Sequence, residues 1–128
     1  MAGYKANIEK LTLENENFRQ VLFTGKYSQL VLMNLMPKEE IGMEVHPNVD
    51  QFFRFEKGEG KVIIDGEESL VSDGDAVVVP AGAEHNVINI GSEPLKIYTI
   101  YSPPNHPDGT IHKTKEEAEA AEAAHRQL

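Results

Sequence analysis

The sequence predicts an all-β domain, an antiparallel sandwich or barrel, with a short helix at its C-terminal end. From residue 21 to residue 100 the chain consists of short apolar or alternating runs, separated by Gly, Pro and Asp residues. Strands of this length and spacing are typical of antiparallel sheets rather than of alternating strands and helices. After Tyr101 the composition changes, because a Pro-containing loop leads into a segment of Ala and Glu. At 128 residues the chain is long enough for one domain.

The predicted elements follow one another in three parts. Residues 1–19 form an N-terminal extension in which Ile8, Leu11 and Leu13 stand among acids and asparagines. Residues 20–102 form the β domain, and the dipeptide Asp65-Gly66 between two β-rich runs predicts a hairpin. The strands are expected near residues 21–23, 27–36, 41–46, 51–55, 61–65, 76–79, 85–90 and 95–101.

The third part, residues 103–128, is predicted to be a loop and a helix. Thr114 and Glu117 have the spacing of a capping box, and residues 118–127 are nearly all Ala and Glu. Because this segment has no large apolar face, we expect a solvated helix. The three histidines of this part, His106, His112 and His125, are interpreted as surface residues from their position.

The composition excludes several function classes. Twenty-one acidic residues against twelve basic ones leave a formal charge of −9, and no cluster of Lys or Arg offsets it. We therefore expect neither nucleic acid nor anionic lipid as a partner. The absence of cysteine excludes disulfides and thiolate chemistry. No apolar run approaches the roughly 20 residues of a membrane span, and the first residues lack the pattern of a signal peptide, so a cytoplasmic location is expected.

Four polar side chains are predicted to meet in one pocket. Glu44 and His46 are two residues apart, so in a strand both point the same way. The turn at Pro47 sends the chain back, and Gln51 opens the next strand. His85 begins a strand directly after the tight turn Pro80-Ala81-Gly82. Two imidazoles, a carboxylate and an amide oxygen form a plausible ligand set for a divalent cation.

These residues resemble the two sequence motifs of the cupin superfamily. The second motif has Gly, Pro-x-Gly, His and Asn at fixed spacing, and this chain matches it at Gly74, Pro80, Gly82, His85 and Asn89. The spacing of the first motif is met at Lys38, Glu44, His46, Gln51 and Gly58, where His46 and Gly58 keep the usual residue type. The resemblance covers about residues 20–102 and implies a cupin-type jelly-roll β-barrel with a short C-terminal helix.

The resemblance also implies a metal site and a class of activity. Many cupins hold a metal with three His and one Glu, and here Glu44 and Gln51 replace a His and the Glu. This oxygen-rich set suits Zn, Mn or Fe better than copper. It resembles the site of phosphomannose isomerases, which points to a metal-dependent enzyme acting on a small polar or sugar-phosphate substrate, such as a mannose-6-phosphate isomerase-like enzyme.

Several alternatives stay open at this point. The chain is also compatible with an iron(II)-dependent dioxygenase, or with a non-catalytic module that binds a metal or a small molecule. The first motif has a second possible register, with His46 and Asn48 as the paired positions. Phe53, Phe55 and Val87 are expected to line the pocket. Because cupins commonly dimerise by sheet-to-sheet packing and the strand edges of an open jelly roll are exposed, we expect a homodimer.

Overall fold

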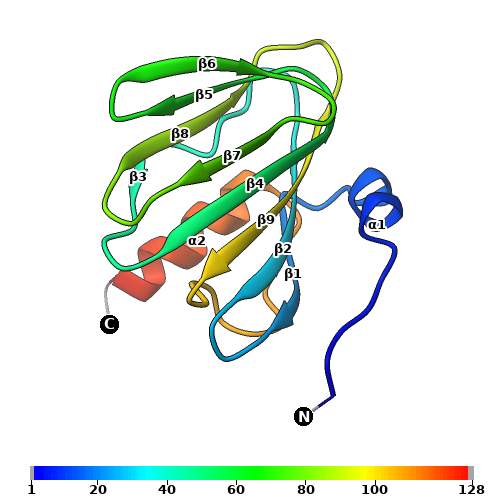
Figure 1. Cartoon of the computed structure of the whole chain (residues 1–128), viewed down its shortest axis with the longest axis vertical. Helices are drawn as coiled ribbons and strands as arrows, with labels where there is room; N and C mark the ends of the chain where they lie inside the picture. The colour runs from blue at the N-terminus through cyan, green and yellow to red at the C-terminus, as the bar shows by residue number, and fades with distance from the viewer. Residues whose placement is uncertain (1, 127–128) are drawn as a thin grey trace.

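Two antiparallel sheets make up most of the chain in the computed structural model, which describes residues 2–126 (Figure 1). One sheet has six strands in the order β10-β1-β2-β9-β4-β7, and the other has four in the order β3-β8-β5-β6. This pairing gives two separate sheets and does not show the continuous ring of a closed barrel. The strands are β1 (Arg19–Thr24), β2 (Gln29–Leu35), β3 (Glu44–Val45), β4 (Asp50–Lys57), β5 (Gly60–Ile64), β6 (Glu67–Val71), β7 (Ala76–Val79), β8 (Glu84–Asn89), β9 (Leu95–Ser102) and β10 (Ile111–His112).

The apolar core follows from the alternation of side chains along the strands. In β4, Phe53 and Phe55 are fully buried, whereas Phe52 and Arg54 between them are only partly buried. The same period of two runs through β9, where Leu95 begins a set of buried alternate residues. Each apolar side chain of this size contributes roughly 1.5–3 kcal/mol when it is buried. One contiguous cluster therefore holds both sheets in place.

All eight predicted strands are present, and the described residues contain two more, β6 and β10. The sequence pattern did not reveal β6 as a strand because four of its five residues are exposed. The hairpin that joins β5 to β6 lies where the sequence predicted it. Asp65 and Gly66 both have positive φ, +48° and +84°, as the twist of a two-residue hairpin requires.

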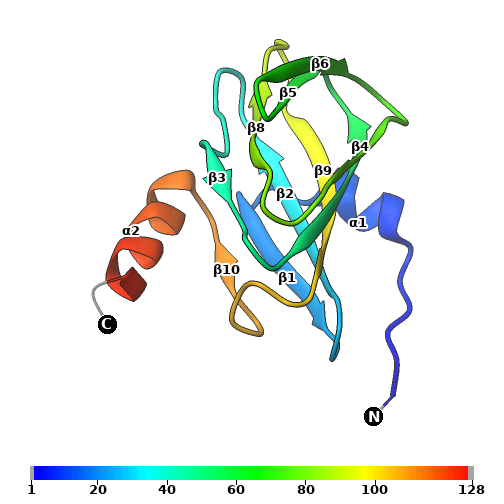
Figure 2. The same ribbon diagram turned by 60° about the vertical axis from the view of Figure 1, so that its left-hand side comes forward.

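Two helices, α1 (Ile8–Glu14) and α2 (Lys115–Arg126), lie on different sides of the β domain (Figure 2). The sequence analysis missed α1, which falls within the predicted N-terminal extension and is capped by the side chain of Asn7. It predicted α2 correctly, including the cap, because the Thr114 hydroxyl accepts a hydrogen bond from the Glu117 amide at 3.1 Å. Among the residues of α2 whose side chains the structure describes, Ala118 is the buried one. This helix lies beside β3 and β10, which are edge strands of the two sheets (Figure 2).

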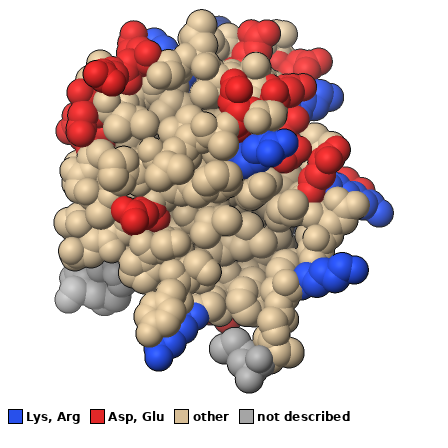
Figure 3. Space-filling model, viewed as in Figure 1, with Lys and Arg blue, Asp and Glu red and all other residues tan. Residues whose placement is uncertain are grey.

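Acidic side chains are unevenly distributed over the surface. Figure 3 shows Asp and Glu mostly in the upper half of the face seen in Figure 1, toward β5 and β6, while the middle of that face is largely uncharged. Neither helix has the length and apolar character needed to cross a membrane.

Candidate metal centre

The pairing of β3 with β8 brings the predicted metal ligands together. Glu44 lies directly opposite His85 across this antiparallel pair. His46 follows β3 two residues after Glu44, so its side chain lies on the same side of the chain. One ligand atom from each of the three residues lies within 4.8 Å of the other two. The structure thus brings together three of the four predicted ligands.

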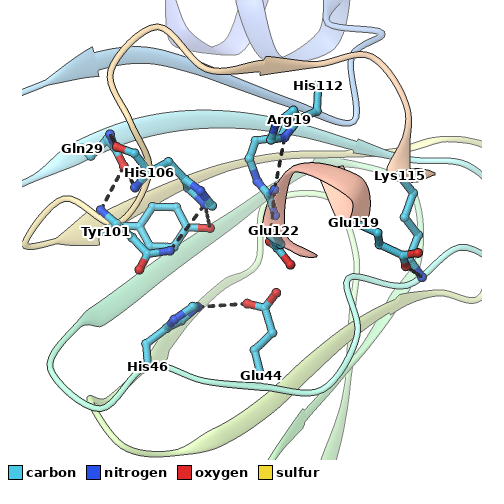
Figure 4. Close-up of polar contacts among 11 residues, drawn as sticks. Arg19, Gln29, Glu44, His46, Tyr101, His106, His112, Lys115, Glu119 and Glu122 are labelled. Carbon is cyan, nitrogen blue, oxygen red and sulfur yellow. Dashed lines mark hydrogen bonds and ion pairs between the residues drawn. The ribbon is translucent and has the colours of Figure 1, made fainter. Parts of the chain in front are cut away.

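Glu44 and His46 are already in contact with each other. Nε2 of His46 lies 2.9 Å from Oε2 of Glu44, and both side chains are largely shielded from solvent (Figure 4). The ring of His46 is also 5.4 Å from the ring of His85. This contact supports the register of the first motif that pairs Glu44 with His46. A divalent cation fits this donor set, because it satisfies a carboxylate and two imidazoles together.

His85 is held with one ring nitrogen directed away from the protein backbone. Its Nδ1 lies 3.1 Å from the carbonyl oxygen of Ala83, and the residue is only 2% exposed. Because a carbonyl oxygen can only accept, Nδ1 must carry the proton. Nε2 then keeps its lone pair and is free to bind a metal. Metal-binding histidines are commonly fixed by a hydrogen bond of this kind.

Gln51 lies buried at the start of β4 with its amide oriented by two hydrogen bonds. The hydroxyl of Thr99 donates to the carbonyl oxygen of Phe52 at 2.8 Å, so it can only accept from Gln51. The Gln51 amide nitrogen donates to this hydroxyl at 3.0 Å. Its oxygen Oε1 therefore points elsewhere, and it is buried without a hydrogen-bond partner. An unsatisfied buried carbonyl oxygen is costly unless a ligand occupies it.

The turn of the second motif connects the two halves of the site. Gly82 has φ +88°, a conformation that favours glycine, and its amide donates to the carbonyl oxygen of His46 at 2.9 Å. The Pro80 carbonyl accepts from the Ala83 amide within the same turn. This short loop therefore sets the start of β8 against the end of β3. The spacing between Pro80 and His85 is therefore important, because this turn determines where His85 lies relative to His46.

A cavity of about 660 Å³ lies next to the candidate metal ligands. Its wall includes Glu44 and His46 on one side and the C-terminal segment on the other. The residues that line it are Met43, Glu44, Val45, His46, Asn105, His106, Pro107, Thr110, His112, Ala121 and Glu122. The C-terminal segment thus closes one side of the cavity.

The three predicted pocket-lining residues have a different position. Phe53, Phe55 and Val87 are fully buried members of the core and are not among the residues that line the cavity. The ring of Phe53 is 6.4 Å from that of His85, so it supports the site from the core side. The alternation of a strand identifies the side chains that face inward. It does not show which of them border an open cavity and which are packed in the core.

Besides His112, the sequence analysis misjudged a second histidine of the cavity, His106. It was interpreted as a surface histidine, but its Nε2 lies 3.2 Å from the Tyr101 hydroxyl and its ring packs edge-on against that of Tyr101 at 5.0 Å. Burial, together with the positive charge of Arg19, lowers the pKa of His106 to about 3. Burial also raises the pKa of Tyr101 to about 12. At neutral pH both groups are uncharged, and the tyrosine proton is available for donation to Nε2.

This low pKa predicts that His106 destabilises the fold in acid. An unfolded chain protonates the imidazole near pH 6.5, whereas the folded chain does not until about pH 3, so stability falls as the pH drops between these values. From pH 7 to pH 5 we expect a loss of up to about 2 kcal/mol from this residue. Urea unfolding of wild type and His106→Gln at both pH values measures it. An equal loss in the two proteins would contradict the assignment.

The comparisons with known proteins identify the family. The chain matches the Cupin domain family (Cupin_2) over residues 31–101. The chain belongs to the cupin family. The uncharacterized protein YrkC of Bacillus subtilis is 50% identical to this cupin over 125 residues, which cover 93% of the cupin and 67% of YrkC. The crystal structure of BH2720 from Bacillus halodurans has a TM-score of 0.92 at 44% identity, covering 93% of this chain and 95% of that chain.

A more distant relative is an enzyme. The mannose-1-phosphate guanylyltransferase of Escherichia coli is 27% identical to this cupin over 78 residues. The match covers 61% of the cupin but only 16% of the enzyme. It therefore relates the cupin to a small part of a much longer protein.

Proposed function

We propose that this cupin is a metal-dependent enzyme that acts on a small polar substrate, with sugar phosphates as the first class to test. The observation that carries the proposal is the convergence of Glu44, His46 and His85, whose ligand atoms lie within 4.8 Å of one another beside an open cavity. A purely structural site would not need such a cavity. The cavity volume lies in the range that small-molecule sites occupy.

Four residues would hold the metal in this proposal. Glu44, His46 and His85 would provide a carboxylate and two imidazoles, and Oε1 of Gln51, which is buried without a partner, would be the fourth ligand. This set suits Zn, Mn or Fe(II). A bound divalent ion supplies Lewis acidity, which polarises a carbonyl or hydroxyl oxygen of the substrate.

The chain's own residues supply orientation and shielding. Glu44 and His46 form one wall of the cavity, and Asn105 and His106 of the C-terminal segment form another. Because His106 is uncharged at neutral pH, it offers a hydrogen bond rather than a charge to a substrate. The sugar-phosphate class is supported by the resemblance of the ligand set to that of phosphomannose isomerases. The distant similarity to a mannose-1-phosphate guanylyltransferase points in the same direction.

Metal analysis of protein purified without added metal is the first test. We expect about one zinc or manganese ion per chain, together with interconversion of mannose 6-phosphate and fructose 6-phosphate. Iron accompanied by oxygen uptake would instead support an iron(II)-dependent dioxygenase. A stable, metal-free protein that gains no metal on dialysis against these ions would overturn the proposal and favour a non-catalytic binding module.

A further inference from the structure

A buried arginine stands behind the wall of the cavity, with most of its hydrogen-bonding capacity unused. Arg19 begins β1 and is only 2% exposed. Its Nε is buried without a hydrogen-bond partner. Arginine carries its charge at any physiological pH, and a buried charge is costly unless it is both paired and hydrogen-bonded. The Arg19 guanidinium is therefore a buried charge whose hydrogen bonds within the protein are incomplete.

The polar contacts that the Arg19 side chain makes come from the C-terminal segment, and its guanidinium carbon also lies 5.4 Å from the centre of the Phe18 ring. Its Nη1 lies 3.4 Å from Nδ1 of His112, the residue directly opposite it on β10. The same nitrogen lies 3.6 Å from Oε1 of Glu122 on α2. Among the residues that the structure describes, Glu122 is the only one whose carboxylate approaches an Arg19 nitrogen within 4 Å. That distance is too long for a hydrogen bond, and the Glu122 side chain is 40% exposed.

Both contact residues face the cavity. His112 and Glu122 line it, while Arg19 lies behind them. Figure 4 shows Arg19 directed toward Glu122, on the opposite side of the open space from Glu44 and His46.

We propose that Arg19 binds the anionic group of this cupin's substrate, and that Glu122 occupies its place in the free protein. The ligand group is a carboxylate or a phosphate monoester, because two oxygens of either match the fork of a guanidinium. The anion displaces the loosely held Glu122 carboxylate and accepts hydrogen bonds from Nη1 and Nη2, which form the end-on fork of the guanidinium. Burial and the charge of Arg19 lower the pKa of His112, which favours its neutral form. The inference rests on the proposed function for its choice of substrate.

In this proposal the two sides of the cavity have different tasks. The candidate metal ligands on β3 and β8 face the reacting end of a substrate, and Arg19 on β1 would hold its charged end. Glu122 is suited to the role of a replaceable anion, since its side chain on α2 is 40% exposed. A tight ion pair at this place would compete with the ligand.

The test measures anion affinity in the full chain, both as purified and after treatment with a chelator. Inorganic phosphate is titrated by isothermal calorimetry into wild type, Arg19→Met and Glu122→Gln. We expect Arg19→Met to weaken binding at least about tenfold, since charge-assisted hydrogen bonds are lost. We expect Glu122→Gln to tighten binding several-fold, because a competing anion is removed. A merely structural role of the pair would not produce this gain.

Two matched variants control for net charge. Arg54→Met removes the same charge from a residue that pairs with Glu56 on β4. Glu119→Gln removes the same charge from α2, at a residue that pairs with Lys115. Both are expected to bind phosphate within about twofold of wild type, because surface charges act weakly at a distance. Malonate titrated in the same way distinguishes a carboxylate from a phosphate, since the tighter ligand identifies the group.

Three outcomes would overturn the inference. The first is that Arg19→Met binds phosphate and malonate each as tightly as wild type does. The second is that Glu122→Gln binds them more weakly than wild type. The third is that none of these proteins binds either anion. If Arg19→Met does not fold, Arg19→Lys replaces it, since lysine keeps the charge but lacks the fork. His85→Ala separates this inference from the proposed function, because it should lose metal and still bind the anion after chelator treatment.

Discussion

Replacing His85 by alanine is expected to reduce the metal content of the purified protein to near zero. The substitution removes one of three side chains whose ligand atoms lie within 4.8 Å of one another. Changes to residues that only orient a metal ligand already cost about 10- to 100-fold in affinity, so loss of a ligand should cost at least about 100-fold. His46→Ala should also lose its metal, because it removes a second member of the cluster, the histidine whose Nε2 contacts the Glu44 carboxylate.

Elemental analysis and zinc titration of the variants measure this effect. His112→Ala is the matched control, since it removes a histidine from the same cavity but not from the cluster. It should keep the metal content of wild type. Circular dichroism confirms that each variant is folded. Full metal occupancy in His85→Ala or His46→Ala would refute the site, and loss of metal in His112→Ala would show that the ligand set is wrongly assigned.

Replacing Asn89 by alanine is expected to destabilise the fold by about 3 kcal/mol without changing metal affinity. Asn89 is 2% exposed, and its amide nitrogen donates to the carbonyl oxygens of Leu35 at 2.9 Å and Glu93 at 2.8 Å. Its side-chain oxygen accepts from the Gly91 amide at 2.9 Å. Alanine leaves three backbone groups without these partners, and each costs roughly 1 kcal/mol or more when it stays buried.

Thermal and urea unfolding measure the loss of stability. The exposed Asn48 provides the control, because Asn48→Ala removes an asparagine side chain that is not buried and should change stability by less than about 0.5 kcal/mol. Zinc affinity should equal that of wild type in both variants. If the urea concentration at the unfolding midpoint is the same for Asn89→Ala and wild type, the three hydrogen bonds do not stabilise the fold as proposed. His85 and Asn89, both in the second motif, thus have separable roles in binding and stability.

Short-range patterns in the sequence predicted much of this cupin. Alternation along the chain placed Phe53 and Phe55 in the core, since successive side chains of a strand face opposite sides. The same period placed Glu44 and His46 on one side, and the structure brings them together with His85. The Asp65-Gly66 hairpin and the cap of α2 were predictable because a few adjacent residues determine each of them.

Features without a local signal were missed or misjudged. Exposed β6 lacks the apolar alternation of a strand, and its hydrogen bonds to β5 give it its structure. The histidines of the C-terminal segment were assigned to the surface, although His106 contacts Tyr101 and His112 contacts Arg19. The prediction that Phe53, Phe55 and Val87 line the pocket depended on which inward residues reach open space, and packing determines that.

The sequence by itself therefore determined that the chain is mostly β, the approximate positions of eight strands and three side chains of the candidate metal site. These depend on periods and turns that span only a few residues. Only the tertiary structure decided that the C-terminal segment closes the cavity and that Arg19 meets His112 and Glu122. Such contacts join residues about a hundred positions apart, as with Arg19 and Glu122, and nothing in the sequence near either residue indicates its partner. Their geometry results from the packing of both sheets and α2 together.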